Sequence, residues 1–129
     1  MANELVLIVE DNDKNRKLAR DVLQVKGYQT VDTDNAEEGI RLARERKPAL
    51  ILMDLHLPGI DGIEALGRLR SDPGTKRIPV IAVTASAMTE DNQKIVAAGF
   101  DALQTKPIHV KDFVRAVGDT FARFKGKAA

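Results

Sequence analysis

Residues 5–11 have the sequence LVLIVED, in which five apolar residues are followed at once by two acids. The apolar part is rich in β-branched side chains and has no polar alternation, which predicts a β-strand buried on both faces. Residues 49–54, ALILMD, repeat the pattern and end at Asp54. Strands of this kind occur in parallel sheets that helices cover on both sides. The two stretches therefore predict an α/β fold with a parallel sheet at its centre.

Extended and helical patterns alternate along the whole chain. The helices are expected to bury apolar residues at helical spacing, including Val25, Ile63 and Val110. Asn35 and Asp61 are expected to cap the helices that follow them. Strands are predicted at residues 5–9, 28–33, 49–53, 80–85 and 101–105, and helices at residues 18–25, 35–47, from 61 to the turn at 71–74, 89–99 and 110–124.

Five strand–helix units in succession predict a doubly wound, five-stranded parallel sheet of the flavodoxin-like (βα)5 type, with right-handed crossovers. We expect residues 1–129 to form one domain, with a core over about residues 5–124 and a frayed tail at residues 125–129. In such a sheet the active site lies outside the carboxyl ends of the strands.

The composition excludes several classes of protein. Apolar residues make up 43% of the chain and charged residues 30%, as in globular rather than disordered proteins. The absence of cysteine excludes disulfides and thiolate metal sites. The net charge is only +1 and the basic residues are spread out, so no nucleic-acid surface is expected. No apolar run suits a signal peptide or a membrane span, so we expect no membrane contact and a cytoplasmic location.

Polar and charged residues lie at the carboxyl ends of four predicted strands. Glu10 and Asp11 follow the first strand, Asp54 the third and Lys106 the fifth, and Thr84 lies at the end of the fourth. None is decisive alone, because acids also cap helices and a threonine or lysine can simply end a strand. The carboxyl ends of parallel strands meet at one edge, so these five side chains are expected to share one small site.

The chemistry of this set points to phosphoryl transfer. Two carboxylates about 4 Å apart repel by roughly 4 kcal/mol at an effective dielectric constant of about 20, a cost that a bound cation would offset. Oxygen ligands without cysteine or histidine favour Mg²⁺. Lys106 supplies a positive charge and Thr84 a hydroxyl donor, which suit the oxygens of a phosphoryl group. Asp54 as the nucleophile would form an aspartyl phosphate.

Four segments of the chain resemble response-regulator receiver domains of the CheY-like type: LVLIVEDN, ILMDLHLPGIDG, VIAVTA and TKP. They occur in order and on the expected strands, and the resemblance extends from Leu5 to about Phe124. It implies the strand order 2-1-3-4-5, which is already known for CheY. It also implies a stand-alone signalling switch rather than an enzyme, which catalyses only its own phosphorylation and slow dephosphorylation. The segments VEDN, ILMDLHLP, VTASAM and KPI are further similar to the DivK-like subgroup, which acts in cell-cycle and polarity signalling.

The resemblance implies roles in phosphoryl transfer for individual residues. Asp54 would be the phosphoacceptor, and Thr84 and Lys106 would hold the phosphoryl oxygens. The peptide bond between Lys106 and Pro107 would be cis, as is usual in the family.

The resemblance also implies a metal site and two residues that tune the phosphorylated state. Asp11, Asp54 and the main-chain carbonyl of His56 would bind Mg²⁺, with Glu10 acting directly or through water. His56 and Ser86, two positions beyond the acceptor and the threonine, would set the lifetime of the phosphoryl group by controlling the access of water.

The partners follow from the same resemblance. A sensor histidine kinase or a histidine phosphotransfer protein would supply the phosphoryl group. A downstream protein would bind the face formed by the fourth helix, fifth strand and fifth helix, around residues 89–98 and 103–124. Many receivers carry Tyr or Phe three residues before the lysine of strand five, but this chain has Leu103. An aromatic switch therefore cannot operate at that position.

Two other functions have a similar sheet. A phosphohydrolase or phosphotransferase with an aspartyl nucleophile, acting on a small substrate, would place that nucleophile after the first strand in a D-x-D pattern. Residues 10–12 are instead Glu-Asp-Asn, and no insertion covers a substrate. A flavin carrier would need a hydroxyl- and glycine-rich phosphate loop at the same place, and an acidic loop would repel phosphate.

Overall fold

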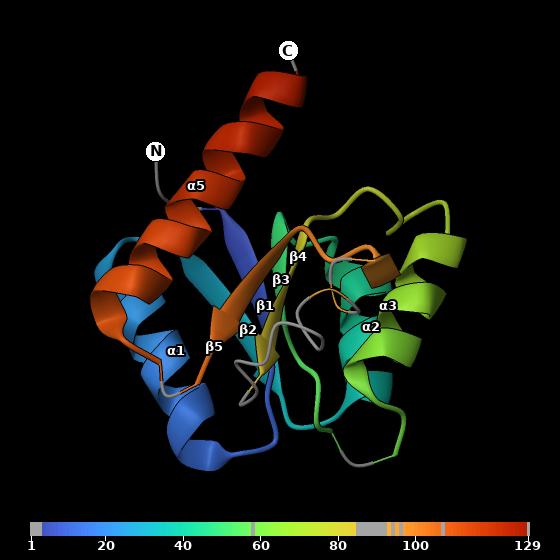
Figure 1. The fold of residues 1–129 in the computed structure, drawn as a ribbon, viewed down its shortest axis with the longest axis horizontal. Helices are drawn as coiled ribbons and strands as arrows, with labels where there is room; N and C mark the ends of the chain where they lie inside the picture. Colours follow the sequence, from blue (N-terminus) through green and yellow to red (C-terminus); the bar gives the residue numbers. More distant parts are fainter. Residues whose placement is uncertain are drawn as a thin grey trace.

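The computed structural model describes residues 4–57, 59–84, 93, 95, 97–106 and 108–128. A five-stranded sheet lies at its centre, and every pair of neighbouring strands is parallel. The strand order is β2-β1-β3-β4-β5, which confirms the predicted topology (Figure 1). The strands are β1 (Leu5–Val9), β2 (Gln29–Thr33), β3 (Leu50–Asp54), β4 (Val80–Thr84) and β5 (Ala102–Thr105).

Helices cover both faces of this sheet. α1 and α5 lie on one face, and α2 and α3 lie on the other (Figure 1). The helix predicted at residues 89–99 is described only at residues 93, 95, 97 and 98, which are helical. The helices with defined bounds are α1 (Asp13–Val25), α2 (Ala36–Arg46), α3 (Gly62–Ser71) and α5 (Val110–Ala128).

Short polar side chains fix the start of three helices. The side chains of Asn12, Asn35 and Asp61 accept hydrogen bonds from the backbone N–H three residues further on, at 3.0, 2.8 and 2.8 Å. Such caps satisfy amide groups that have no partner inside the helix. The caps predicted at Asn35 and Asp61 are confirmed. Asn12 directly follows the acidic pair, so the start of α1 is tied to the predicted site.

Alternate residues of the buried strands build two separate cores. Leu7 and its cross-strand partner Ile51 pack with α2 and α3, whereas Ile8 and its partner Leu52 pack with α1 and α5. Each buried aliphatic side chain of this size stabilises the fold by about 1.5–3 kcal/mol. The need to fill both cores explains why β1 and β3 have uninterrupted apolar sequences.

Some predictions about the helices were wrong. Val25, Ile63 and Val110 were expected to face the core, but they are 82%, 45% and 48% exposed. Val25 is the last residue of α1, Ile63 lies in the first turn of α3, and Val110 is the first residue of α5. All three positions lie at helix ends, where a side chain is covered less completely by the sheet than in the middle of a helix. The last helix, expected to end at about residue 124, continues to residue 128.

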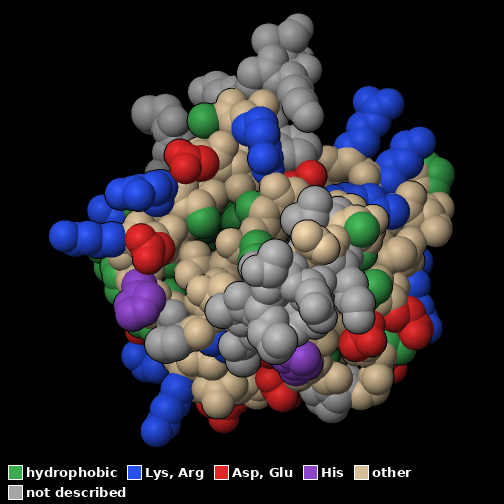
Figure 2. Space-filling model, in the orientation of Figure 1, with side chains coloured by type: hydrophobic (Ala, Val, Ile, Leu, Met, Phe, Trp, Pro, Cys, Tyr) green, Lys and Arg blue, Asp and Glu red, His purple; other side chains and the backbone are tan. Residues whose placement is uncertain are grey.

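The charged side chains are distributed over the surface, as expected from the spread of charged residues along the sequence. On the face shown in Figure 2, acidic and basic side chains of the described residues lie beside one another around the rim. Within the described part of the chain, no helix is long and apolar enough to cross a bilayer.

Arg70 of α3 ties together the starts of β4 and β5. Its guanidinium donates to the carbonyl of Ile78 at 2.6 Å and to the carboxylate of Asp101 at 2.9 Å. The same oxygen of Asp101 accepts the amide N–H of Val80 at 2.8 Å. The network therefore links α3, β4 and β5 at the end of the sheet opposite the predicted site.

We expect Arg70→Ala to lower the free energy of unfolding by about 1.5 kcal/mol, because partly buried acceptors lose a charged donor. Arg68→Ala is the matched control. Arg68 pairs with Glu64 on the same helix, but both side chains are about half exposed, so its loss should cost less than about 0.5 kcal/mol. Urea unfolding of the two variants and the parent measures the difference. Equal losses would mean that the Arg70 network does not stabilise the fold.

Candidate metal and phosphoryl-transfer site

The register of the sheet places two acids side by side. Val9 of β1 pairs with Met53 of β3, so the next step along both strands brings Glu10 opposite Asp54. Both side chains are buried, with Glu10 4% and Asp54 1% exposed. The adjacency expected from the carboxyl ends of these strands is confirmed.

Lys106 directly follows β5 and contacts both of these acids. Thr105 of β5 pairs with Thr84 of β4, and the amide N–H of Lys106 donates to the Thr84 carbonyl at 2.7 Å. This anchor directs the lysine inward. Its Nζ lies 3.0 Å from Oε1 of Glu10 and 3.2 Å from Oδ2 of Asp54. One ammonium thus offsets the charge of two buried carboxyl groups.

Asp11 completes an acidic cluster with Glu10 and Asp54. One carboxylate oxygen from each of the three residues lies within 4.8 Å of the others. Asp11 is exposed to solvent, whereas the other two acids are buried. Hard oxygen ligands on one open side of a site suit Mg²⁺, which keeps several of its waters. The residues present therefore fit a magnesium ion.

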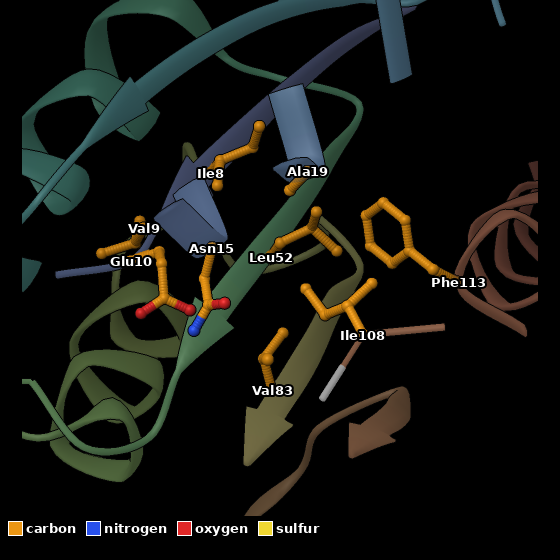
Figure 3. Close-up of a pocket in the computed structure, with 9 residues that line it drawn as sticks. All are labelled: Ile8, Val9, Glu10, Asn15, Ala19, Leu52, Val83, Ile108 and Phe113. Carbon is orange, nitrogen blue, oxygen red and sulfur yellow. The ribbon is translucent and has the colours of Figure 1, made fainter. Parts of the chain in front are cut away.

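Glu10 lies in surroundings that disfavour its charge. A cavity of about 10 Å³ lies beside it, and most of the cavity wall is apolar, including Ile8, Leu52 and Phe113 (Figure 3). Burial, followed by a hydrogen bond with Asp54, raises the pKa of Glu10 to about 7. The two neighbouring acids can therefore share a proton near neutral pH when no cation is bound.

Asp54 has the opposite tendency. Burial acts to raise its pKa, but hydrogen bonds from Glu10 and from the amide N–H of His56, together with Lys106, lower the pKa of Asp54 below its ordinary value. The His56 amide lies 3.0 Å from Oδ1 of Asp54. Burial also opposes the charge of Lys106, yet its contacts with both acids raise the pKa of Lys106 overall. The site thus holds a carboxylate beside a cation.

The remaining predicted site residues are placed in part. Thr84 is the last residue of β4 and is 1% exposed, one strand away from Asp54. His56 lies two residues beyond Asp54 with an exposed side chain. Ser86 and Pro107 lie outside the described residues.

Two residues that shape the site were not identified from the sequence. A Cβ atom on Gly62 would lie 2.8 Å from the carbonyl oxygen of Asp54, so only glycine lets α3 start against the acceptor strand. A glycine directly after the cap Asp61 was the available signal. Arg16 of α1 donates to the carbonyl oxygen of Glu10 at 2.9 Å. No local pattern distinguishes this arginine from the other bases of its helix.

Comparison with known proteins agrees with this arrangement. Residues 6–118 match the family model of the response regulator receiver domain. The chain belongs to this family. Receiver domains are signalling switches and are generally not classed as enzymes. This receiver is similar to the polar-differentiation response regulator DivK of Brucella anthropi, with 46% identity over 112 residues that cover 87% of this chain and 91% of the Brucella protein.

Solved structures show the same fold. The receiver domain of the sensor histidine kinase PA1611 from Pseudomonas aeruginosa superposes with a TM-score of 0.86 at 29% identity, covering 94% of this chain and 99% of that one. That structure has a magnesium ion coordinated in the active site cleft. The chemotaxis response regulator CheY4 of Vibrio cholerae has a TM-score of 0.87 at 22% identity, covering 92% and 99% of the two chains.

Proposed function

We propose that this receiver accepts a phosphoryl group on Asp54 from a phosphohistidine of a sensor kinase or a histidine phosphotransfer protein. The observation that carries the proposal is the buried Asp54 carboxylate, 3.2 Å from Lys106 and within a cluster of three acids. The ionised state of Asp54 provides the nucleophile. Its burial keeps competing water away from the reacting oxygen.

In the proposed step, an oxygen of Asp54 attacks phosphorus and an O–P bond forms as the N–P bond of the phosphohistidine breaks. The imidazole nitrogen keeps the electron pair of that bond and takes up a proton. Lys106 then pairs with the phosphoryl oxygens instead of with free carboxylates, and Thr84 donates its hydroxyl to another of these oxygens. Both groups stabilise charge that builds up on the transferred group.

Glu10, Asp11, Asp54 and the main-chain carbonyl of His56 would hold Mg²⁺ in this proposal. When bound, the ion neutralises the acids and the charge on the phosphoryl oxygens. The cluster of carboxylate oxygens within 4.8 Å supports the three acids of this ligand set. The exposed position of Asp11 suits a ligand that meets the ion at the solvent side.

The lifetime of the phosphorylated state is proposed to depend on His56 and Ser86. The exposed side chain of His56 stands two residues beyond the acceptor, where it can screen the phosphoryl group or orient a water molecule. The cis geometry expected for the bond between Lys106 and Pro107 stays a prediction.

The output is proposed to be the binding of another protein, controlled by phosphorylation, through the fourth helix, β5 and α5. A groove of about 330 Å³ runs along β5 and α5, and Leu103 and Arg115 contribute to its walls. Leu103 is partly buried against the core of α2 and α3, and this aliphatic side chain cannot act as a rotating aromatic switch. Similarity to DivK supports a role in cell polarity, and the cytoplasm stays the predicted location.

An aspartyl-nucleophile phosphohydrolase acting on a small substrate is the alternative function. The residue directly after β1 is Glu10 rather than an aspartyl nucleophile, and Glu10 contacts Lys106. Of the two buried acids at the site, Glu10 has a raised pKa, whereas the pKa of Asp54 at the end of β3 is lowered. Both observations favour the receiver.

We expect acetyl phosphate with Mg²⁺ to add one phosphoryl group to the protein, measured as intact mass. The parent in chelator and Asp54→Asn in Mg²⁺ should stay unlabelled, because one lacks the metal and the other the nucleophile. Asp61→Asn is a control, since its side chain caps α3 and does not take part in the site. A parent that gains no mass in Mg²⁺, or an Asp54→Asn variant labelled as fully as the parent, would refute the proposed function.

A further inference from the structure

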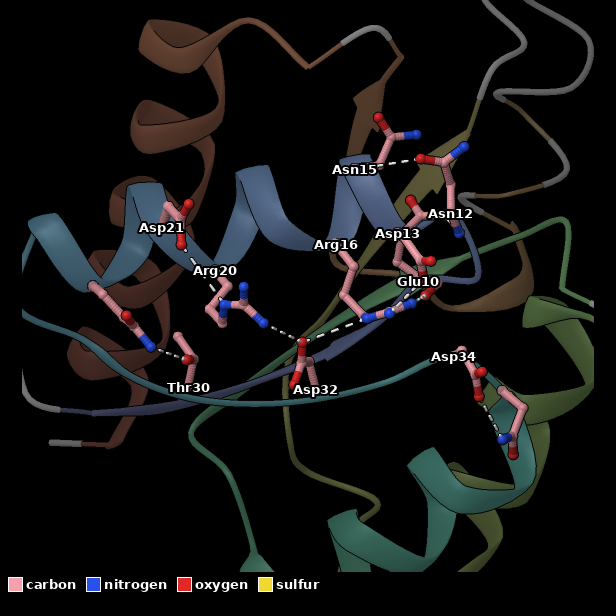
Figure 4. Close-up of polar contacts among 12 residues, drawn as sticks. Glu10, Asn12, Asp13, Asn15, Arg16, Arg20, Asp21, Thr30, Asp32 and Asp34 are labelled. Atoms are coloured by element: carbon pink, nitrogen blue, oxygen red, sulfur yellow. Dashed lines mark hydrogen bonds and ion pairs between the residues drawn. The ribbon is translucent and has the colours of Figure 1, made fainter.

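The turn that carries the metal-binding acids is held by one arginine. Arg16, the fourth residue of α1, points back toward the end of β1 (Figure 4). Its Nη1 donates to the main-chain carbonyl of Glu10 at 2.9 Å, and its Nη2 donates to the carboxylate of Asp13 at 2.6 Å. The two ends of the guanidinium therefore contact both sides of the turn that contains Asp11.

A third contact fixes the guanidinium to the sheet. Nε of Arg16 lies 3.5 Å from Oδ2 of Asp32 on β2, which pairs with Ile8 of β1. The Arg16 side chain is 21% exposed and the Asp32 side chain 26%, so solvent screens this contact only in part. A planar guanidinium has donors in a fixed fork and suits three acceptors spread around it, which a lysine ammonium cannot match.

We propose that Arg16 is a positioning residue that holds Glu10 and Asp11 in the geometry for binding Mg²⁺. This inference rests on the proposed magnesium site. The carbonyl oxygen of Glu10 and the amide nitrogen of Asp11 belong to the same planar peptide group. A hydrogen bond to that oxygen restrains the orientation of the peptide plane between Glu10 and Asp11. The orientation of this plane in turn influences the direction in which the side chain of Asp11 projects from the backbone.

The neighbouring Arg20 supplies a matched control. It lies one helical turn further along α1 and pairs with the same Oδ2 of Asp32, at 3.4 Å. Figure 4 shows Arg16 and Arg20 on either side of Asp32, with only Arg16 extending to Glu10. Replacing either arginine with glutamine removes one positive charge and one contact with Asp32. Only Arg16→Gln also releases the Glu10 carbonyl.

The sign of the effect separates positioning from electrostatics. Loss of a nearby positive charge should by itself strengthen the binding of a divalent cation, because a repulsion disappears. A positioning role predicts the reverse. We expect Arg16→Gln to raise the dissociation constant for Mg²⁺ at least about tenfold, the range typical for residues that orient metal ligands. Arg20→Gln should change it less than about twofold.

The test is a calorimetric titration of parent, Arg16→Gln and Arg20→Gln with Mg²⁺, at a temperature where unfolding shows all three to be folded. Relaxation of water protons with Mn²⁺ in the same site gives a second measurement. If Asp11 is no longer held in place, water should replace it on the ion and the relaxation per bound ion should rise in Arg16→Gln alone.

The possible outcomes are distinct. Unchanged or tighter Mg²⁺ binding by Arg16→Gln, while the parent binds, overturns the role of Arg16 and leaves the proposed function intact. Equal weakening in Arg20→Gln also overturns it, since the effect would then come from the shared pair with Asp32. A parent that binds no Mg²⁺ refutes both the inference and the proposed function.

Discussion

Lys106→Ala is expected to lower the free energy of unfolding of the metal-free protein by about 3 kcal/mol just above neutral pH. Lys106 lies 3.0 Å from Glu10 and 3.2 Å from Asp54, and both acids are almost fully buried. Without the lysine, two carboxyl groups would remain in a site with little water and no cation. The removal of one partner from a buried charge pair is costly for this reason.

The pH dependence of this loss has a definite sign. The pKa of Lys106 is raised in the fold, so its contribution is fully present below its unfolded pKa and is lost only as the pH rises through the folded value. Glu10, whose pKa is about 7, can take up a proton in mildly acidic solution and reduce the repulsion. The variant should therefore be closest to the parent in stability below about pH 6.

Mg²⁺ should restore much of the stability lost in Lys106→Ala, because a bound cation replaces the missing charge. Thermal unfolding of parent and variant, in chelator and in excess Mg²⁺, measures both effects. Lys17→Ala is the control, since Lys17 forms an exposed pair with Asp21 on α1. If Lys106→Ala unfolds at the same temperature as this control in chelator, the buried bridge does not stabilise the fold.

The fold could be predicted because the sequence repeats one physical pattern. β1 is apolar throughout, and β3 is apolar up to its last residue, Asp54, because each face of the sheet packs against helices. Strands buried on both faces are a property of parallel sheets. The exposed end residues of helices, such as Val25 and Val110, could not be predicted in this way. Helical spacing identifies the face of a helix but not how far the sheet extends beneath it.

The site was predicted from the positions of residues at strand ends, and its electrostatics were not. Adjacent ends of β1 and β3 made the meeting of Glu10 and Asp54 predictable. The sequence suggested equal crowding of three acids, but the structure buries Glu10 and leaves Asp11 in solvent. The contact of Arg16 with the Glu10 carbonyl depends on the angle between α1 and β1, which no local pattern encodes.

Glu10→Gln is expected to stabilise the metal-free protein by about 2 kcal/mol above about pH 7, although it removes a hydrogen-bonding charge. Burial and the hydrogen bond with Asp54 raise the pKa of Glu10 from 4.5 to about 7. A carboxyl group with a raised folded pKa contributes stability below its unfolded pKa, and this contribution is lost as the pH rises through the folded value. The parent in chelator should therefore become less stable between about pH 4.5 and pH 7.

Glutamine copies the shape and the neutral state of Glu10, so Glu10→Gln should lose less stability over the same pH range. Asp54 cannot account for this slope, because its pKa is lowered and its contribution is lost only in more acidic solution.

Mg²⁺ should reverse the order of the two proteins. The ion needs the charged form of Glu10, so it should stabilise the parent increasingly as the pH rises through about 7 and stabilise Glu10→Gln much less. Urea unfolding of both proteins across this pH range, with chelator and with Mg²⁺, gives all four curves. A parent whose stability in chelator rises steadily from pH 5 to pH 8, parallel to that of Glu10→Gln, would show that Glu10 is ionised throughout and that the acids share no proton.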